Sequence, residues 1–311
     1  MDGILAQEMF AAFQRAPPLT GYVFIDVLGN GKSAAVFRAT APSGSSRAIK
    51  VYDPELAARY GAAVQEGRQQ RELTLANHTC PNLVQIYGGG KLATNKGEAT
   101  YLEMEYVEGF DLSAKIAPRA FDDAAIRKAL RELCVAADYL HQRGLCHRDI
   151  KTDNIRLRPN GHLVLLDLGV LRPLGRSDLT DTPTNRYFVG TLRYAPPELL
   201  HRREDAEDTN AWRAIDVYQI GTVLYELIQG AKLFAHVPDD PYADLVIAVD
   251  EHRPSLVRSD IGEDLIRLSR NALEKEPASR LRAAPWQSLL ATANAPPVVA
   301  PSSIWKASFG K

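Results

Sequence analysis

The spacing of apolar residues changes from strand-like to helix-like between residues 107 and 121. Before that point, five segments have the composition and length of strands, at 22–28, 35–40, 46–52, 83–89 and 100–106. In the last of these, Leu102, Met104 and Tyr106 should face one way and Glu103 and Glu105 the other. After residue 121 the apolar residues recur at helical spacing. The sequence therefore predicts an α+β fold in two lobes: a small antiparallel sheet with one helix, a short connector, and a larger, mainly helical lobe.

Capping residues indicate where the helices begin. In the first lobe, Asp53 at the N-cap and Pro54 at the first helical position predict a helix to about Asn77, with a break near Gly61 or Gly67. In the second lobe, Asp122 caps a helix that Gly144 ends. The apolar face of that helix comprises Ile126, Leu130, Leu133, Ala137 and Leu140. Further helices are expected at 216–230, 262–275 and 285–292.

These signals predict four regions: a lead-in at 1–19, the first lobe at 20–106, the second lobe with its connector at 107–292, and a loose tail at 293–311. With 37 basic and 38 acidic residues, nothing in the charge favours nucleic acid as a partner. The three cysteines form no CxxC pair, and the first residues lack a basic region followed by a long apolar run, so we expect no secretory signal and a cytoplasmic protein. No apolar run reaches the ~20 residues of a membrane span, and the oligomeric state is unknown from the sequence.

A glycine-rich segment, GNGKSAAV, lies between the first two strands and contains Gly29, Gly31 and Val36. Glycine lets backbone N–H groups approach phosphate oxygens without a Cβ in the way. The segment also resembles a Walker A loop and a dinucleotide-binding fingerprint, but both require a helix directly after the glycines, whereas AVFRAT alternates like a strand. Taken alone, an ordinary hairpin turn explains it equally well.

A lysine lies among apolar strand residues in the segment Ala48-Ile49-Lys50-Val51. A buried ammonium is costly unless it is paired. Glu72, in the middle of the predicted helix, is the first candidate partner of Lys50 and Glu66 the second. An exposed lysine on an edge strand is the simpler alternative.

The strongest signal is a polar run, HRDIKTDN at 147–154, between apolar segments, followed by Asp167 at the end of the apolar run LVLL. Phosphoryl transfer needs a carboxylate at the hydroxyl proton, oxygen ligands for Mg²⁺ and cations that offset charge. Asp149, Lys151, Asn154 and Asp167 supply all of these groups. A polar loop with a capping Asp would explain any one of them but not the set.

With GTLRY at 190–194 and PPE at 196–198, the motifs resemble those of the eukaryotic-type (Hanks-type) Ser/Thr protein kinase family, and the Ala- and Arg-rich composition suggests a bacterial member. The resemblance runs from Gly29 to Arg280. It implies a two-lobed kinase fold and transfer of the γ-phosphate of ATP to a protein substrate, with Mg²⁺ (Mn²⁺ as a substitute) and with autophosphorylation of the activation loop.

The resemblance also implies roles for individual residues. The catalytic set would be Asp149 as base, Lys151 at the γ-phosphate, Lys50 at the α/β-phosphates with Glu72 as its partner, and Thr191 bonded to Asp149. The metal ligands would be Asn154 and Asp167. The nucleotide would contact Gly29, Gly31, Val36, Ala48, Lys50, Met104, Glu105, Val107, Asp111 and Arg156. Buried pairs that stabilise the second lobe would involve Glu198 with Arg280, and Asp216.

The sequence departs from the family pattern at several positions. Ala34 replaces the third glycine and Leu168 an aromatic residue, while Arg156 replaces the aliphatic floor of the adenine pocket. The stem of Arg156 could cover the base with its head in water, or its charge could lie over the purine. A charged stretch at 201–212 is expected to be a solvated loop. Phosphorylation of the activation segment is expected at Thr182 or Thr184, paired with Arg148, among the candidates Ser177, Thr180, Thr182, Thr184 and Tyr187.

Two other function classes share part of this pattern. A small-molecule kinase has the same acidic core but lacks the GTLRY and PPE segments. A non-catalytic pseudokinase would be expected to have lost Lys50, Asp149, Asn154 or Asp167, and all four are present. An active protein kinase is therefore the preferred interpretation.

Overall fold

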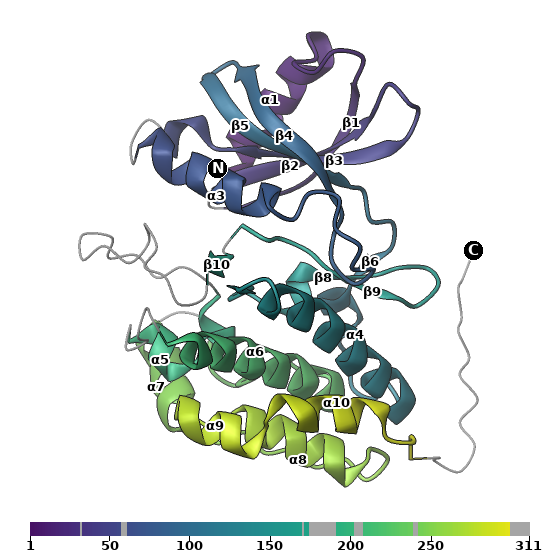
Figure 1. Cartoon of the computed structure of the whole chain (residues 1–311), viewed down its shortest axis with the longest axis vertical. Coiled ribbons are helices and arrows are strands. Elements are labelled where there is room, and N and C mark those ends of the chain that lie inside the picture. The colour runs from purple at the N-terminus through teal and green to yellow at the C-terminus, as the bar shows by residue number, and fades with distance from the viewer. Residues whose placement is uncertain are drawn as a thin grey trace.

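The computed structural model describes residues 1–31, 33–56, 61–169, 171–173, 191–201, 208–238 and 242–298. Figure 1 shows a sheet-containing N-lobe above a helical C-lobe, which confirms the predicted two-lobed α+β fold. Within these ranges, no helix combines the length and the apolar character needed to cross a membrane.

The N-lobe is built on a five-stranded sheet with the order β1-β2-β3-β5-β4. Every neighbouring pair is antiparallel. The strands are β1 (Val23–Asn30), β2 (Ala34–Thr40), β3 (Ser46–Tyr52), β4 (Ile86–Thr94) and β5 (Gly97–Glu105). Alternation along β5 follows the expectation, since Leu102 and Met104 are buried while Glu103 and Glu105 are partly exposed.

Each face of this sheet packs against a different part of the chain. Phe37, Ile49 and Val51 on one face form a cluster with α1 (Gly3–Arg15), whose Phe13 lies edge-on to Phe37. Ala48, Leu102 and Met104 on the other face belong to the core that continues into the C-lobe. Because side chains alternate along a strand, Lys50 lies on the same face as Ala48 and is directed toward the C-lobe.

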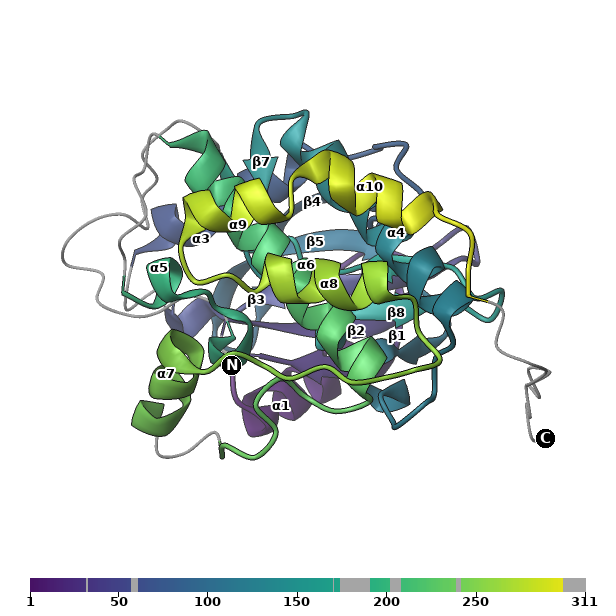
Figure 2. The ribbon, with the colours of Figure 1, turned by 90° about the horizontal axis from the view of Figure 1, so that it is seen from below.

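The C-lobe core surrounds two long helices, α4 (Asp123–His141) and α6 (Thr209–Gln229). Seen from below, the last helices lie against these two (Figure 2). The other C-lobe helices are α5 (Pro197–Leu200), α7 (Tyr242–Glu251), α8 (Glu263–Ala272), α9 (Pro277–Ala283) and α10 (Trp286–Asn294). Asp122 caps α4 by accepting a hydrogen bond from the Ala125 amide, and the predicted apolar face of α4 is fully buried.

Short strands at the top of the C-lobe position the polar run. β6 (Phe110–Asp111), β8 (Ile155–Leu157) and β9 (Leu163–Leu165) form a three-stranded sheet. β7 (Leu145–Cys146) pairs with β10 (Arg172–Pro173). The polar run therefore lies between β7 and β8, and Asp167 follows β9.

The break expected near Gly61 or Gly67 is found at Gly61, which has a φ of 95° and precedes α3 (Ala62–Leu73). The structure corrects the predicted end of this helix, because α3 stops at Leu73 and not at about Asn77. The expectation of a solvated loop at 201–212 is wrong for its last residues, which form the first turn of α6. Asp208 caps that turn through the Asn210 amide, and Trp212 within it is buried. Residues 202–207 lie outside the described ranges.

Candidate active site

A buried ammonium group joins the two lobes. Nζ of Lys50 on β3 donates to Oε1 and Oε2 of Glu72 on α3, at 3.1 and 3.2 Å, and to Oδ1 of Asp167 in the C-lobe at 2.9 Å. Glu66, the second candidate partner, instead contacts Lys91 at 3.0 Å. The structure therefore places Glu72 and Asp167 on either side of Lys50.

The electrostatics of this group follow from its burial. Burial by itself would lower the pKa of Lys50, but the charges of Asp167 and Glu72 outweigh it and hold that pKa well above its ordinary value. The Lys50 ammonium holds the pKa of Asp167 below its usual range, whereas burial raises the pKa of Glu72. Lys50 and Asp167 are therefore both charged near neutral pH; the Lys50 ammonium is buried, whereas the Asp167 side chain is 51% exposed.

The carboxylate of Asp149 has one oxygen engaged and one without a partner. Oδ2 accepts hydrogen bonds from Nζ of Lys151 at 2.8 Å and from Nδ2 of Asn154 at 2.9 Å. Oδ1 is buried and has no hydrogen-bond partner among the residues that the structure describes. Buried polar atoms are nearly always bonded, so this oxygen is the natural acceptor for a group brought by a ligand.

Thr191 is positioned differently from the expectation. Its Oγ1 accepts a hydrogen bond from Nζ of Lys151 at 2.5 Å, and it therefore reaches Asp149 through Lys151 rather than directly. Lys151 thus bridges a hydroxyl and a carboxylate at the same point. Gly190, the preceding residue of the motif, and all five activation-segment candidates lie outside the described residues.

The loop that carries Asp149 is held from below by α6. Asp216, fully buried, accepts hydrogen bonds from the amides of His147 and Arg148 at 3.0 and 2.8 Å, and contacts Nε2 of His141 at 2.8 Å. Gln219 accepts a bond from the Ile150 amide at 2.8 Å and donates to the Arg148 carbonyl. Arg148 has a φ of 67°, an unfavourable conformation for a residue with a side chain, so these bonds explain how the loop retains it.

Two oxygen-bearing side chains next to Asp149 could hold a divalent metal. The amide nitrogen of Asn154 bonds to Asp149, which makes the side-chain oxygen of Asn154 the atom able to bind a metal. The Leu166 amide donates to the Asn154 backbone carbonyl at 2.7 Å, which brings Asp167 close to Asn154. Among the described residues, no group of three or more His, Cys, Asp or Glu side chains is arranged around a common metal position. Two protein ligands suit Mg²⁺, which keeps several waters and binds substrate phosphates.

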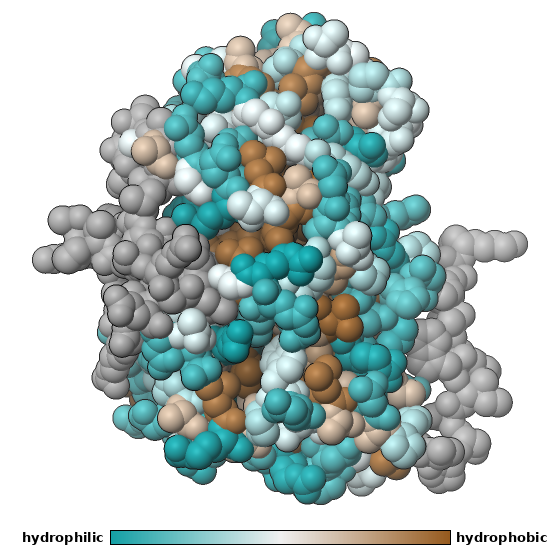
Figure 3. All heavy atoms as spheres, viewed as in Figure 1, coloured by the Kyte–Doolittle hydropathy of each residue, from teal (hydrophilic) through white to brown (hydrophobic). Residues whose placement is uncertain are grey.

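An apolar surface lies between the lobes, where Figure 3 shows brown side chains between the sheet and the helices. Ala48 and Met104 are direct cross-strand partners on β3 and β5, and both are buried together with Val107. Val36 on β2 packs against the same cluster. The structure therefore brings together the residues expected to enclose a purine. A Cβ added to Gly29 or Gly31 would meet no protein atom within 4 Å, so packing within the protein does not explain these glycines.

The guanidinium head of Arg156 is held by two hydrogen bonds at the C-lobe side of the apolar surface. Its Nη1 donates to Oδ1 of Asp111 at 3.0 Å and its Nη2 to the Gly109 carbonyl at 2.7 Å. The guanidinium head is therefore turned toward Asp111, another residue that the family resemblance places at the nucleotide. Nε of Arg156 is buried without a hydrogen-bond partner in the described part of the chain.

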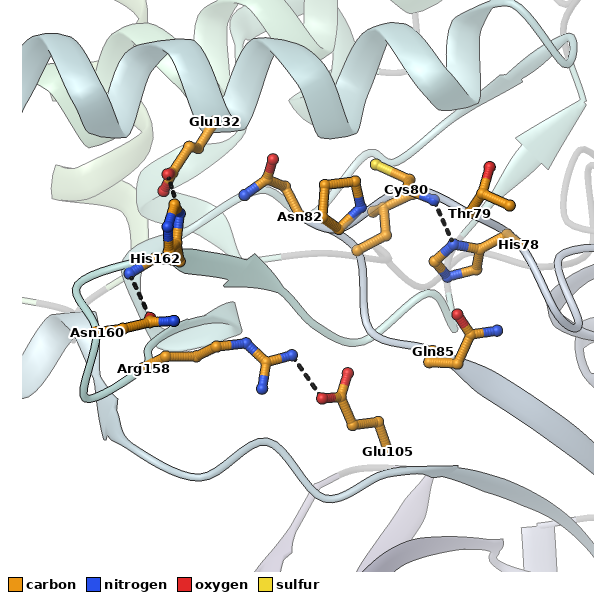
Figure 4. Close-up of a pocket in the computed structure, with 12 residues that line it drawn as sticks. His78, Thr79, Cys80, Asn82, Gln85, Glu105, Glu132, Arg158, Asn160 and His162 are labelled. Carbon is orange, nitrogen blue, oxygen red and sulfur yellow. Dashed lines mark hydrogen bonds and ion pairs between the residues drawn. The ribbon is translucent and has the colours of Figure 1, made fainter.

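A cavity of about 540 Å³ lies between the segment that contains His78 to Gln85, α4 and the turn between β8 and β9 (Figure 4). Glu105 and Arg158 form an ion pair there at 2.5 Å, and His162 contacts Glu132 at 2.7 Å. Glu105 is the only lining residue that also belongs to the predicted nucleotide set. The Glu105 amide donates to the Gln85 carbonyl at 2.8 Å. Lys50, Asp149 and Asp167 do not line this cavity, so it is not the candidate active site.

The pairs expected to stabilise the C-lobe are present. Arg280, fully buried on α9, donates to Oε1 and Oε2 of Glu198 at 2.5 and 3.1 Å. His147 and Leu168, on either side of the site, are both buried. Two sets of contacts were not predicted from the sequence. Gln219 bonds to the loop that carries Asp149, and the Tyr52 hydroxyl donates to Oε1 of Glu72. A polar residue inside the apolar run of α6 was the available signal for Gln219.

Comparison with known proteins agrees with this geometry. Residues 22–291 match the protein kinase domain family. The chain is 31% identical to the serine/threonine-protein kinase PknB of Mycolicibacterium smegmatis over 76% of this chain and 37% of that protein. It is 26% identical to protein kinase C-like 2 of Schizosaccharomyces pombe over 91% of this chain and 26% of that protein. It is 33% identical to CBL-interacting serine/threonine-protein kinase 19 of Arabidopsis thaliana over 66% of this chain and 40% of that protein. The chain thus spans well under half the length of these relatives.

Proposed function

Since this chain belongs to the protein kinase domain family, we propose that it is a Ser/Thr protein kinase that transfers the γ-phosphate of ATP to a hydroxyl group of a protein substrate. The observation that carries the proposal is the convergence of Lys50, Asp167 and the Asp149 loop at one point between the lobes. Cations, carboxylates and an unpartnered acceptor are together there, as phosphoryl transfer requires.

Oδ1 of Asp149, which has no hydrogen-bond partner among the described residues, is the atom proposed to accept the proton of the substrate hydroxyl. As that proton leaves, the hydroxyl oxygen forms a bond to the γ-phosphorus, and the bond from this phosphorus to the oxygen shared with the β-phosphate breaks. Lys151, held by Asp149 and Thr191, offsets charge on the transferring group. Lys50, fixed by Glu72, holds the α- and β-phosphates. Positioning and charge stabilisation supply most of the acceleration.

Asn154 and Asp167 are the residues proposed to hold Mg²⁺, with Mn²⁺ as a substitute. The ion, when bound, neutralises charge on the phosphate oxygens. The donor set fits, because one carboxylate and one carboxamide oxygen leave the remaining positions to phosphate and water.

The adenine is proposed to lie against Val36, Ala48 and Met104, with its edge read by the backbone of Glu105 and Val107. Asp111 and Arg156 then lie at the ribose side of the pocket, where their ion pair is found. Gly29 and Gly31 are proposed to let the β1–β2 turn approach the phosphates, since no packing contact accounts for them.

Three further features belong to the proposal. The pairing of Lys151 with Thr191 favours Ser and Thr over Tyr as acceptors, by resemblance to the family. Autophosphorylation is proposed at Thr182 or Thr184. A cytoplasmic location is also proposed, because the buried Cys80 and Cys134 are thiols that form no disulfide among the residues the structure describes.

The test is incubation of the purified chain with γ-labelled ATP and Mg²⁺, alone and with a generic basic protein, followed by mapping of the labelled residues. We expect label on serine or threonine of the added protein and on the activation segment, and loss of both with Asp149→Asn. Nucleotide binding without any transfer would identify a non-catalytic protein and refute the proposal.

A further inference from the structure

Helix α3 carries Glu72, yet its sequence, AAVQEGRQQREL, has few apolar residues with which to dock on the sheet. Three polar side chains are nevertheless buried on it: Gln65, Gln69 and Glu72. Their spacing of four and three residues places them on one face of a helix. The face of α3 that meets the sheet therefore contains a polar stripe.

Every member of this stripe bonds to a different part of the sheet. Nε2 of Gln65 donates to the carbonyl of Asp53, directly after β3, at 2.8 Å. Nε2 of Gln69 donates to the carbonyl of Gly90 on β4 at 2.8 Å and to that of Tyr101 on β5 at 2.7 Å. Gly90 and Tyr101 are cross-strand partners, so this one amide group bridges two paired strands.

Glycines in β4 leave room for the side-chain amide of Gln69. β4 contains three consecutive glycines, Gly88 to Gly90, beside a register irregularity. A Cβ added to Gly89 would lie 2.4 Å from the Tyr101 carbonyl oxygen and 3.2 Å from Nε2 of Gln69. Only glycine at this position lets the amide reach both carbonyls.

The last residue of the polar stripe, Glu72, accepts hydrogen bonds from two residues of β3, Lys50 and Tyr52. Tyr52 is two residues after Lys50 on β3, on the same face, and its hydroxyl donates to Oε1 of Glu72. Tyr52 is 1% exposed and the Lys50 ammonium lies 5.2 Å from its ring centroid. The phenol therefore fixes the orientation of the carboxylate that Lys50 meets.

From these contacts we infer that Gln69 and Tyr52 are positioning residues, which hold α3 and the Glu72 carboxylate in the arrangement that keeps Lys50 ready for a nucleotide triphosphate. Apolar packing is non-directional and tolerates sliding of a helix, whereas buried hydrogen bonds fix its register. The contacts that hold α3 here come from β3, β4, β5 and Asp53, all within the N-lobe. The kinetic part of this inference rests on the proposed kinase function.

The experiment uses the full chain with Gln69→Leu and Tyr52→Phe, each with a matched control. Gln70→Leu makes the same change at an exposed position of α3, and Tyr87→Phe removes a more exposed phenol from β4. Hydrogen–deuterium exchange of peptides that cover 65–73 is measured first. We expect about tenfold faster exchange in both test variants and unchanged exchange in both controls, because a few buried bonds set the local opening free energy.

The second readout separates positioning from general stability. We expect Tyr52→Phe to lower kcat/KM for ATP by about tenfold, the loss expected for one hydrogen bond to a charged group, while KM for the protein substrate stays constant. In the double variant with Glu72→Ala, Tyr52→Phe should add no further loss, since Glu72→Ala already removes the acceptor of the Tyr52 hydroxyl.

The inference would be overturned if the test variants showed the same exchange rates and the same kcat/KM for ATP as the controls. It would also be overturned if the losses of kcat/KM in the two single variants multiplied in the double variant. If Gln69→Leu does not fold, the test relies on Tyr52→Phe alone, because this variant loses only the hydroxyl and keeps the packing of the aromatic ring. If the wild-type chain transfers no phosphate, the kinase proposal fails, and the exchange measurement still decides whether these side chains hold α3.

Discussion

Nζ of Lys50 lies 2.9 Å from Oδ1 of Asp167, although 117 residues separate them in the sequence. The contact joins β3 of the N-lobe to the segment after β9 of the C-lobe. It also pairs a buried cation with the carboxylate proposed to bind metal, so the relative position of the two lobes and the proposed chemistry depend on the same bond. The following predictions test the residues around it.

Asp149→Asn should lower phosphate transfer by about 10²- to 10⁴-fold, the usual contribution of a general base. The amide keeps the shape and an acceptor oxygen but cannot take up a proton. Steady-state transfer of label from γ-labelled ATP measures the loss. Asp153→Asn, an exposed position in the same loop, is the matched control. Near-normal transfer by Asp149→Asn would exclude the role assigned to that carboxylate.

Lys50→Met should reduce kcat/KM for ATP by about 10²-fold or more, because it removes a preorganised cation from a buried site. It also leaves Glu72 and Asp167 without the charge that compensates them, so the unfolding temperature should fall while a folded protein remains. Lys91→Met on β4, an exposed lysine, should change neither quantity. Unchanged ATP kinetics in Lys50→Met would contradict the proposed phosphate contact.

Arg280→Met should destabilise the C-lobe by about 3–5 kcal/mol, because it leaves the Glu198 carboxylate buried without its cation. The backbone carbonyls of Ala214 and Glu274 would lose donors as well. Urea-induced unfolding followed by circular dichroism gives the free energy. Arg282→Met, an exposed position on the same helix, should stay within experimental error of the wild type.

Asp216→Asn should lower the free energy of unfolding at pH 7 by about 2 kcal/mol, the value of hydrogen bonds to a charged group. Burial opposes the charged form of Asp216, but the bond with His141 and the Arg148 amide outweigh it and lower its pKa below the ordinary 3.8. The unfolded chain therefore binds more protons, and the contribution of this carboxylate is present above pH 3.8 and lost as the pH falls through the folded-state pKa. Unfolding curves of both proteins at falling pH should converge. A constant difference would show that the charge of Asp216 is not responsible.

Arg156→Leu should lower KM for ATP by about fivefold, equivalent to one net hydrogen bond of about 1 kcal/mol. The change frees Oδ1 of Asp111 for a ribose hydroxyl and gives the pocket an apolar floor. Discrimination between ATP and 2′-deoxy-ATP should increase at the same time, as both kinetics and calorimetry can measure. A higher KM would show that the guanidinium itself binds the nucleotide.

Much of the local structure could be predicted from the sequence, because it depends on neighbouring residues. Alternation along 100–106, the Asp122 cap and the apolar face of α4 are all found as expected. The residue types of phosphoryl transfer could also be recognised, since HRDIKTDN and Asp167 lie in short segments. Where the prediction failed, as at the start of α6, a cap at Asp208 and the burial of Trp212 outweighed a charged composition.

The sequence by itself determined the two-lobed plan and the set of reactive groups, through patterns that repeat within a few residues. Only the tertiary structure decided that Lys50 pairs with Glu72 and not Glu66, that Thr191 bonds to Lys151, and that the head of Arg156 turns to Asp111. These choices depend on distances of a few ångströms between side chains from distant segments. Such distances follow from how the helices and strands pack, and no local pattern in the chain encodes them.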